Sequence, residues 1–253
     1  MARIALLQLQ LQENTEKLME HVTRLLSNAD AAEADIVCLP EQWYPKNVQN
    51  FEQEFKVIMD IAKEYDTTII AGAFLETVRK NTTYISCPVI GSNGAIQGRQ
   101  FKIHPFGDER SKVKAGSKVE IFTSKKYKFG VAICHDVVFP EVSRAITLKG
   151  ADMIFYPSRI REDGIEPWHL YVQVRSLENR VPVAAPNICG KQYGGKSMIV
   201  DFEYNEKNNI ALPRQALASV NEQILVMDID VENARRIRRV RLEDIKTELY
   251  KTL

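Results

Sequence analysis

Apolar stretches of strand type alternate with helical patterns in the first third of the chain. The runs at 3–9, 35–39 and 67–74 predict buried strands, and Pro40 ends the second of them. The order strand, helix, strand, helix, strand is typical of a layered α/β fold. The two helices are predicted from apolar residues at helical spacing: Leu18, Val22, Leu25 and Leu26, behind a cap near Asn14 or Thr15, and then Phe51, Phe55, Ile58 and Ala62.

The pattern changes after residue 81. Two strand-type runs flank the sequence Gly-Ser-Asn-Gly, which predicts a β-hairpin within residues 82–101 and therefore sheets of mixed direction. Because no linker, low-complexity segment or repeat interrupts the series, one domain spanning residues 1–253 is the simplest interpretation. Further strands are predicted at 127–133, 153–156, 181–185, 197–202 and 224–229, and further helices from about Pro140 and over 166–180.

The composition indicates a folded protein without a strong overall field. The chain has 253 residues, of which 45% are hydrophobic, enough for a substantial core. With 34 basic and 33 acidic side chains, its formal charge of +1 attracts neither nucleic acid nor anionic lipid. No apolar stretch approaches the ~20 residues that span a bilayer. Residues 1–14 are apolar over too short a length for a signal peptide and lack its cleavage site. We expect neither a nucleic-acid partner nor membrane association.

Two further features of composition bear on location and partners. Four cysteines (Cys38, Cys87, Cys134 and Cys189) are widely scattered, which is typical of reduced thiols in a cytoplasmic protein. The basic stretch at 234–244 invites comparison with a nucleic-acid patch. The neutral chain as a whole and the acidic residues at the end of that stretch favour a solvated or subunit-bridging segment instead.

The sequence GKQYGGKS at 190–197 matches the pattern of a phosphate-binding loop letter for letter. Such a loop needs a helix directly after its Lys-Ser, because the helix N-terminus supplies amides and a positive dipole to the phosphate. The residues that follow, MIVDFEY, are rich in strand formers. We therefore predict a glycine-rich loop between two strands and not a nucleotide site.

Three polar residues directly follow predicted strands. Glu41 follows DIVCLP, Lys102 follows the outgoing arm of the hairpin, and Cys134 follows FGVAI. Ligands gather at the carboxyl ends of strands in open α/β sheets, so adjacent strand ends are expected to bring an acid, an amine and a thiol together. Taken singly, each has a structural alternative: a solvated turn residue, a surface lysine and a buried core thiol.

The chemistry of Cys134 has several alternatives. His135 and Asp136 are its neighbours, but no Cys-x-x-Cys or His-x-x-x-His spacing supports a metal site, and no nearby cysteine supports redox catalysis. A nucleophile needs a base and an oxyanion donor, which Glu41 and Lys102 provide. On an extended chain the His135 side chain points away from Cys134, so a conventional Cys-His pair is not expected.

Three blocks of this sequence, ADIVCLPEQWY, RQFKIHPFGDE and FGVAICHDVVFPE, resemble the signature blocks of the nitrilase superfamily, the carbon–nitrogen hydrolases. The later segments EPWHLYVQVRSLENRVPVAAPNICG, GGKSMIVDF and LEDIKTELY are similar to further parts of that family, so the resemblance covers essentially the whole chain. The resemblance implies an α/β fold in the form of a four-layer αββα sandwich with two mixed β-sheets. It also implies homodimers or higher homo-oligomers that pair through their helical layers.

The same resemblance implies a Glu-Lys-Cys triad that hydrolyses a carbon–nitrogen bond without metal or organic cofactor. Glu41 matches the general base, Lys102 the oxyanion stabiliser and Cys134 the nucleophile that forms a thioester. Glu109 matches a second glutamate that orients the substrate and holds the lysine, with its neighbour Asp108 as the alternative. The remaining implied roles are the His135 backbone N–H as a second oxyanion donor and Arg175, Glu178 and Asn179 as structural residues.

The residues that follow Cys134 favour one class of substrate over another. The sequence Cys-His-Asp, where true nitrilases usually carry Cys-Trp-Glu, favours a small amide, with a nitrile as the alternative. An acyltransferase and a non-catalytic binding protein on the same fold also stay open. Ser158 and Arg159 follow a strand end that faces the same pocket, where Arg159 is expected either to bind a carboxylate or to lie in a solvated loop. Trp43, Tyr44 and Phe106 are expected to line an apolar part of the pocket.

Overall fold

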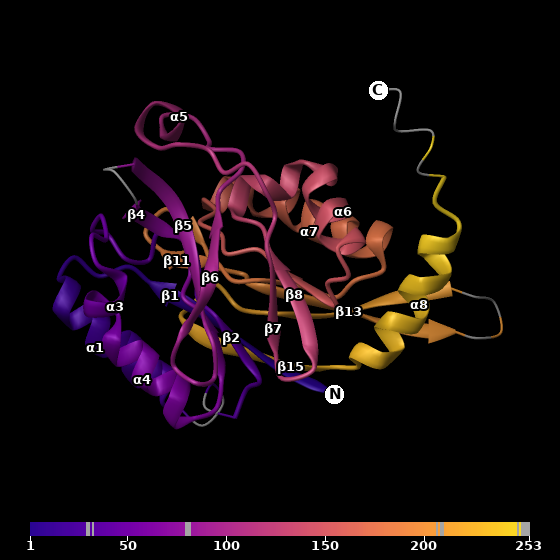
Figure 1. Cartoon of the computed structure of the whole chain (residues 1–253), viewed down its shortest axis with the longest axis horizontal. Coiled ribbons are helices and arrows are strands. Elements are labelled where there is room, and N and C mark those ends of the chain that lie inside the picture. The colour runs from indigo at the N-terminus through magenta and orange to yellow at the C-terminus, as the bar shows by residue number, and fades with distance from the viewer. Residues whose placement is uncertain are drawn as a thin grey trace.

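Two β-sheets lie face to face in the computed structural model, with helices on the outer side of each (Figure 1). The structure describes residues 1–28, 31, 33–78, 82–205, 207, 210–246 and 248. The predicted αββα sandwich with two mixed sheets is confirmed by this arrangement. No helix in these described ranges is long and apolar enough to cross a membrane.

The first sheet is built mainly from the N-terminal half of the chain. Its central strands run parallel, and hairpin strands add antiparallel pairs at its edge. The strand order is β12-β11-β1-β2-β3-β5-β4, with β15 also paired to β1 and β6 to β5. The strands are β1 (Ala2–Gln10), β2 (Ile36–Cys38), β3 (Thr68–Ile70), β4 (Phe74–Val78), β5 (Thr82–Ile90), β6 (Ile96–Phe101), β11 (Ile188–Gly190), β12 (Tyr193–Gly194) and β15 (Gln223–Ile229).

The second sheet has the order β14-β13-β10-β9-β8-β7. Its three central strands are parallel and the outer ones antiparallel. The strand β13 directly follows the Lys-Ser of the glycine-rich loop, so the predicted absence of a phosphate-loop helix is confirmed. The strands are β7 (Ile121–Ser124), β8 (Tyr127–Val131), β9 (Met153–Phe155), β10 (Val183–Ala185), β13 (Met198–Asn205) and β14 (Ile210–Leu217).

Helices cover the outer face of each sheet. Each of the longer helices buries an apolar face against its sheet. The helices α1 (Thr15–Leu26), α3 (Phe51–Glu54) and α4 (Lys56–Glu64) cover the first sheet, and α6 (Pro140–Leu148) and α7 (Ile165–Asn179) cover the second (Figure 1). The Asn14 side chain caps α1 as predicted, and Pro140 is the first residue of α6.

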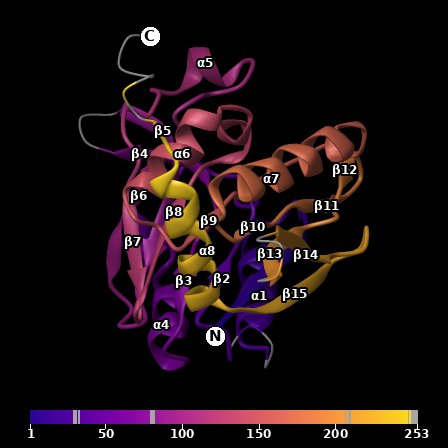
Figure 2. The same ribbon diagram turned by 90° about the vertical axis from the view of Figure 1, so that its right-hand side faces the viewer.

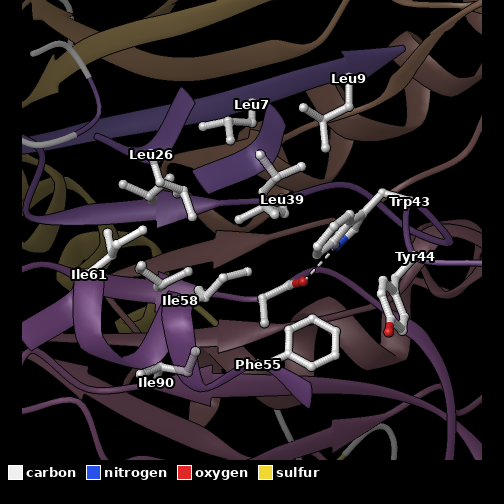
Figure 3. Packing of buried hydrophobic residues seen from close by; sticks show 14 of the residues in the cluster. Leu7, Leu9, Leu26, Leu39, Trp43, Tyr44, Phe55, Ile58, Ile61 and Ile90 are labelled. Atoms are coloured by element: carbon white, nitrogen blue, oxygen red, sulfur yellow. Dashed lines mark hydrogen bonds between the residues drawn. The ribbon is translucent and has the colours of Figure 1, made fainter. Parts of the chain in front are cut away.

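Three clusters of buried side chains separate the four layers. One packs α1, α3 and α4 against the first sheet and is shown in Figure 3. A second fills the space between the two sheets, where Ile4, Leu6 and Ile36 meet Phe129 and Phe155. The third packs α6 and α7 on the second sheet. The sandwich therefore buries both faces of the central strands, which explains their nearly continuous apolar runs.

Two predicted elements differ in the structure. The helix predicted from Phe51 to Ala62 is broken at Phe55, whose backbone leaves the helical region between α3 and α4. The strand predicted over 67–74 ends at Ile70, because Gly72 turns the chain with a φ of +76°. A Cβ at Gly72 would lie 2.3 Å from the Pro40 carbonyl oxygen, so only glycine lets the two segments approach.

The basic stretch near the C-terminus forms α8 (Val231–Glu243), which lies against β13 and is drawn in yellow in Figure 2. Two of its arginines make an internal contact. Arg235 and Arg238 both bind the buried Asp152 carboxylate, with shortest distances of 2.7 and 3.1 Å. We call these three residues the α8 cluster. The prediction of a solvated or subunit-bridging segment did not include this internal contact, because the acidic partner lies more than 80 residues away in the chain.

Candidate active site

Three predicted residues meet on one cavity of about 570 Å³. Glu41 lies beyond the end of β2, Lys102 follows β6, and Cys134 begins a short 3₁₀ turn, η1 (Cys134–Val138), beyond β8. From the sequence we expected adjacent strand ends, but these three strand ends are not neighbours in one sheet. Glu41 and Lys102 come from the first sheet and Cys134 from the second, so the cavity opens where the two sheets face each other.

The Lys102 ammonium lies between two carboxylates. Its Nζ is 2.7 Å from Glu41 Oε1 and 2.8 Å from Glu109 Oε2. We call these three residues the cavity cluster. The side chains of Lys102 and Glu41 are 1% and 3% exposed, whereas Glu109 is 22% exposed toward the cavity mouth. Glu109 is itself held by the Phe106 N–H at 2.7 Å and by Gln42 Nε2 at 3.2 Å.

Asp108, the alternative to Glu109, occupies the N-cap position of the short helix α5 (Glu109–Lys112) and is exposed. Of these two neighbours, Glu109 is the one that binds Lys102. Burial opposes the charge of Lys102, but the nearby Glu41, Cys134 and Glu109 outweigh it and raise the pKa of the ammonium well above its ordinary value. Lys102 therefore carries a positive charge throughout the pH range of ordinary assays.

The surroundings of Cys134 favour the protonated form of its thiol. Burial raises its pKa most, and the Glu41 carboxylate raises it further, while Lys102 and the backbone N–H of Arg159 lower it. The balance is a pKa well above the ordinary value. The backbone of Cys134 also has a φ of +46°, which is uncommon for a residue other than glycine. A reaction at this sulfur thus requires that its proton moves to a nearby base, and Glu41 is the carboxylate that acts on it directly.

The turn at Cys134 is not extended, so the expectation that His135 points away along an extended chain was wrong in its geometry. His135 Nδ1 lies 3.1 Å from the His104 carbonyl oxygen, and its ring packs near Phe106 and Phe139 while lining the cavity. The first N–H groups of a helical turn have no partner within the turn. The His135 N–H lies near the start of such a turn, directly after Cys134.

The turn is held from the α7 side by Arg175. Its Nε donates to the Val137 carbonyl oxygen at 2.8 Å and its Nη2 to that of Val138 at 2.9 Å. Glu178 pairs with Arg175 at 3.2 Å, and Asn179 donates to the Arg175 carbonyl oxygen. These contacts fix the last residues of the turn without reaching into the cavity.

Of the five residues predicted for the pocket, the structure brings two to the cavity. Phe106 and Arg159 line it. Trp43 and Tyr44 instead belong to the cluster beneath α3 and α4, where the Trp43 indole donates to the Ala71 carbonyl oxygen at 2.8 Å (Figure 3).

Ser158 is fully buried behind the cavity, and its side chain donates to the Tyr156 carbonyl oxygen. Its own carbonyl oxygen accepts from the Glu41 N–H at 3.1 Å, which ties the first sheet to the second next to the cavity cluster. Ser158 thus holds the backbone of Glu41 and does not form the cavity wall.

The outer walls come from segments that sequence reasoning did not select. They include the start of α7 and the loop around β12, and the residues are Arg161, Pro167, Trp168, Tyr171, Gln192 and Tyr193. Trp168 and Tyr171 are visible in the sequence as aromatic residues of a predicted helix. Helical spacing alone does not distinguish a core-facing aromatic from one that lines a cavity.

The described part of the chain contains no group of three His, Cys, Asp or Glu side chains arranged to hold a metal ion. The other three thiols lie away from the cavity. Cys38 and Cys87 are buried between the sheets, and burial raises the pKa of both. Burial likewise raises the pKa of Cys189 to about 11. Cys134 is thus the cysteine that lines the cavity.

Comparison with known proteins agrees with this fold and identifies the family. The model of the carbon–nitrogen hydrolase family matches residues 3–239. A "probable nitrilase" of Schizosaccharomyces pombe is 32% identical over 208 residues, which cover 79% of this chain and 74% of that protein. A deaminated glutathione amidase of Synechocystis is 29% identical over 225 residues, covering 78% and 83%. A carbon–nitrogen hydrolase structure from Helicobacter pylori superposes with a TM-score of 0.85 at 24% identity, covering 99% and 97%. The chain belongs to the carbon–nitrogen hydrolases of the nitrilase superfamily.

Proposed function

We propose that this protein hydrolyses a small amide to a carboxylic acid and ammonia through a thioester on Cys134. The observation that carries the proposal is the Lys102 ammonium held at 2.7 and 2.8 Å between the Glu41 and Glu109 carboxylates, on the same cavity as the Cys134 thiol. This arrangement combines a nucleophile, a base and a fixed cation, which are the parts that acyl transfer requires.

The first half of the reaction forms the thioester. Glu41 takes the proton from the Cys134 thiol as the sulfur attacks the amide carbonyl carbon. The negative charge that develops on the carbonyl oxygen is stabilised by Lys102 and the His135 backbone N–H; loss of one such donor typically costs ~10²–10³ in rate. Glu41 then gives its proton to the amide nitrogen, the carbon–nitrogen bond breaks, and ammonia leaves.

The second half restores the enzyme. Glu41 takes a proton from a water molecule, whose oxygen attacks the thioester carbon. The carbon–sulfur bond breaks, the acid is released, and the proton returns to the Cys134 sulfur. Glu109 holds Lys102 from its other side through both steps, so the ammonium keeps its position as the proton on Glu41 comes and goes. No step requires a metal ion or an organic cofactor.

The substrate class is supported by the cavity and by the relatives. Apolar side chains such as Val138 and Trp168 line the cavity beside the cavity cluster, which suits a short acyl chain. One relative is named an amidase and another a nitrilase, so an amide is the first candidate and a nitrile the second. Transfer of the acyl group to an amine instead of water would use the same thioester.

The direct test is intact-protein mass spectrometry with a panel of small amides and nitriles, coupled to an ammonia assay. The expected result is ammonia release together with a transient acyl adduct on the wild-type protein. Cys134→Ala is expected to lose both, with turnover lower by a factor on the order of 10⁶. The matched control is Cys189→Ala, which removes a buried thiol away from the cavity.

Each departure from that result has a defined meaning. Ammonia release that survives Cys134→Ala would refute the cysteine mechanism. An adduct that passes to an added amine, with little free acid, would identify an acyltransferase. Lack of both adduct and ammonia across the whole panel would count against the amide and nitrile proposal and favour a non-catalytic role for the cavity.

A further inference from the structure

A buried carboxylate that the mechanism does not use lies directly behind the cavity. Asp136 is fully buried and belongs to the same turn as Cys134. Its two oxygens accept four hydrogen bonds. Oδ1 accepts from the His104 backbone N–H at 2.8 Å and lies 3.0 Å from His104 Nδ1. Oδ2 accepts from the backbone N–H of Ile103 at 3.2 Å and of Ile133 at 3.0 Å.

The donors to Oδ2 identify what this carboxylate joins. Ile103 directly follows Lys102, and Ile133 directly precedes Cys134. A single oxygen atom therefore links the chain neighbours of two proposed reactive residues, which come from different sheets. The strand β6, which precedes Lys102, pairs only with β5 among the described strands, so pairing within the sheet holds this segment from one side.

Because Asp136 is fully buried, its carboxylate depends on these hydrogen bonds. A fully buried carboxylate is costly unless several donors compensate its charge. Here the donors come from both the segment after Lys102 and the turn around Cys134, so compensation requires both to be in place at once. The Asp152 carboxylate of the α8 cluster is equally buried, but two arginines and one backbone N–H compensate it far from the cavity.

We propose that Asp136 is a positioning residue. It fixes the position of the Lys102 segment, which comes from the first sheet, relative to the Cys134 turn, which comes from the second. It touches neither substrate nor sulfur in this role. Reacting groups displaced by about 1 Å typically lose ~10²-fold in rate. Loss of the Asp136 contacts would displace Lys102 relative to Cys134. The rate of the chemical step would then fall, while the cavity walls that bind the substrate stay in place.

The test compares Asp136→Asn with Asp152→Asn in the full chain. Both changes keep the size of a buried aspartate side chain and replace its carboxylate by an amide. For Asp136→Asn we expect kcat to fall by about 10²-fold with little change in KM. For Asp152→Asn we expect kcat per folded molecule to stay at the wild-type value.

A second readout is independent of turnover. Glu41 and Lys102 are the charged groups that act on the Cys134 thiol, and Lys102 lowers the pKa of that thiol. If the Lys102 segment moves away, the thiolate forms at higher pH. Alkylation of Cys134 by iodoacetamide, followed by peptide mass mapping across a pH series, should therefore shift toward higher pH in Asp136→Asn and stay unchanged in Asp152→Asn.

The two readouts separate this inference from the proposed function, on which only its kcat arm rests. If wild type releases no ammonia, the proposed function fails while the alkylation profile still tests the tie. A folded Asp136→Asn with wild-type kcat and alkylation profile would overturn the inference, as would equal changes in Asp152→Asn. If Asp136→Asn does not fold, His104→Ala removes the ring contact to Oδ1. It should shift the profile in the same direction by less, and an unchanged profile there would also overturn the inference.

Discussion

The molecule contains two buried ion clusters that are near mirror images in charge. In the cavity cluster one ammonium, Lys102, lies between two carboxylates. In the α8 cluster one carboxylate, Asp152, lies between two guanidinium groups. Both bring together residues far apart in the chain, and the central group of each is almost completely shielded from water. Only the cavity cluster faces an open volume and a thiol.

The difference supports the role that we propose for the cavity cluster. In the α8 cluster both oxygens of Asp152 accept internal hydrogen bonds, from the two arginines and from the Lys128 N–H. These bonds fasten α8 to the sheet. The cavity cluster has a carboxylate in excess of its cation, and that carboxylate, Glu41, acts on the protonated Cys134 thiol. A base beside the thiol proton is what permits a proton transfer during the proposed reaction.

The largest expected effect separates the two clusters by removing a cation from each. Lys102→Met should lower turnover by about 10²–10³-fold, because it removes an oxyanion donor. Arg235→Met should leave turnover per folded molecule unchanged while lowering the denaturant midpoint, because Asp152 loses a partner. Steady-state ammonia assays and urea unfolding of both variants measure the contrast. Near-normal turnover in Lys102→Met would refute the proposed role of this lysine.

A smaller effect is expected from the acid dependence of the α8 cluster. Burial alone would raise the pKa of Asp152, but hydrogen bonds from Arg235, the Lys128 N–H and Arg238 outweigh it and hold that pKa below its ordinary value. A lowered folded-state pKa stabilises the protein above the unfolded-state value, about 3.9, and this contribution is lost as the pH falls through the folded-state value.

Wild type should therefore exceed Asp152→Asn in stability by about 2 kcal/mol at neutral pH. The gap should begin to narrow as the pH falls below about 4, where the carboxyl of Asp152 in the unfolded chain takes up a proton, and it should be lost as the pH falls through the lower folded-state value. Urea unfolding of both proteins from pH 7 to pH 3 measures the gap. A difference that is constant over this range would show that the charge of Asp152 does not contribute to stability.

The smallest effect concerns a cation that neither cluster neutralises. Arg159 lines the cavity and stacks over the Tyr193 ring at 5.4 Å, and the described residues include no carboxylate paired with it. We expect Arg159→Gln to raise KM about tenfold for amides whose acyl chain carries a carboxylate, because a charged hydrogen bond is lost. Neutral amides of the same length are the control, and equal effects on both would contradict a carboxylate-binding role.

The sequence predicted most of the fold where local pattern was strong. The capped helix α1, the hairpin of β5 and β6, the start of α6 at Pro140 and the strand after the glycine-rich loop all follow from residues near one another in the chain. The break at Phe55 and the turn at Gly72 were missed because packing between distant segments decides them. The segment at 247 and 249–253, part of the predicted C-terminal match, lies outside the described residues.

The sequence by itself determined that an acid, an amine and a thiol each follow a strand, because strand ends are marked by short local patterns. Only the tertiary structure decided that these ends belong to two facing sheets, that Trp168 rather than Trp43 lines the cavity, and that Asp136 joins the neighbours of Lys102 and Cys134. The physical reason is range. Local periodicity reports which side chains share a face, whereas the partner of that face depends on sheet packing between residues far apart in the chain.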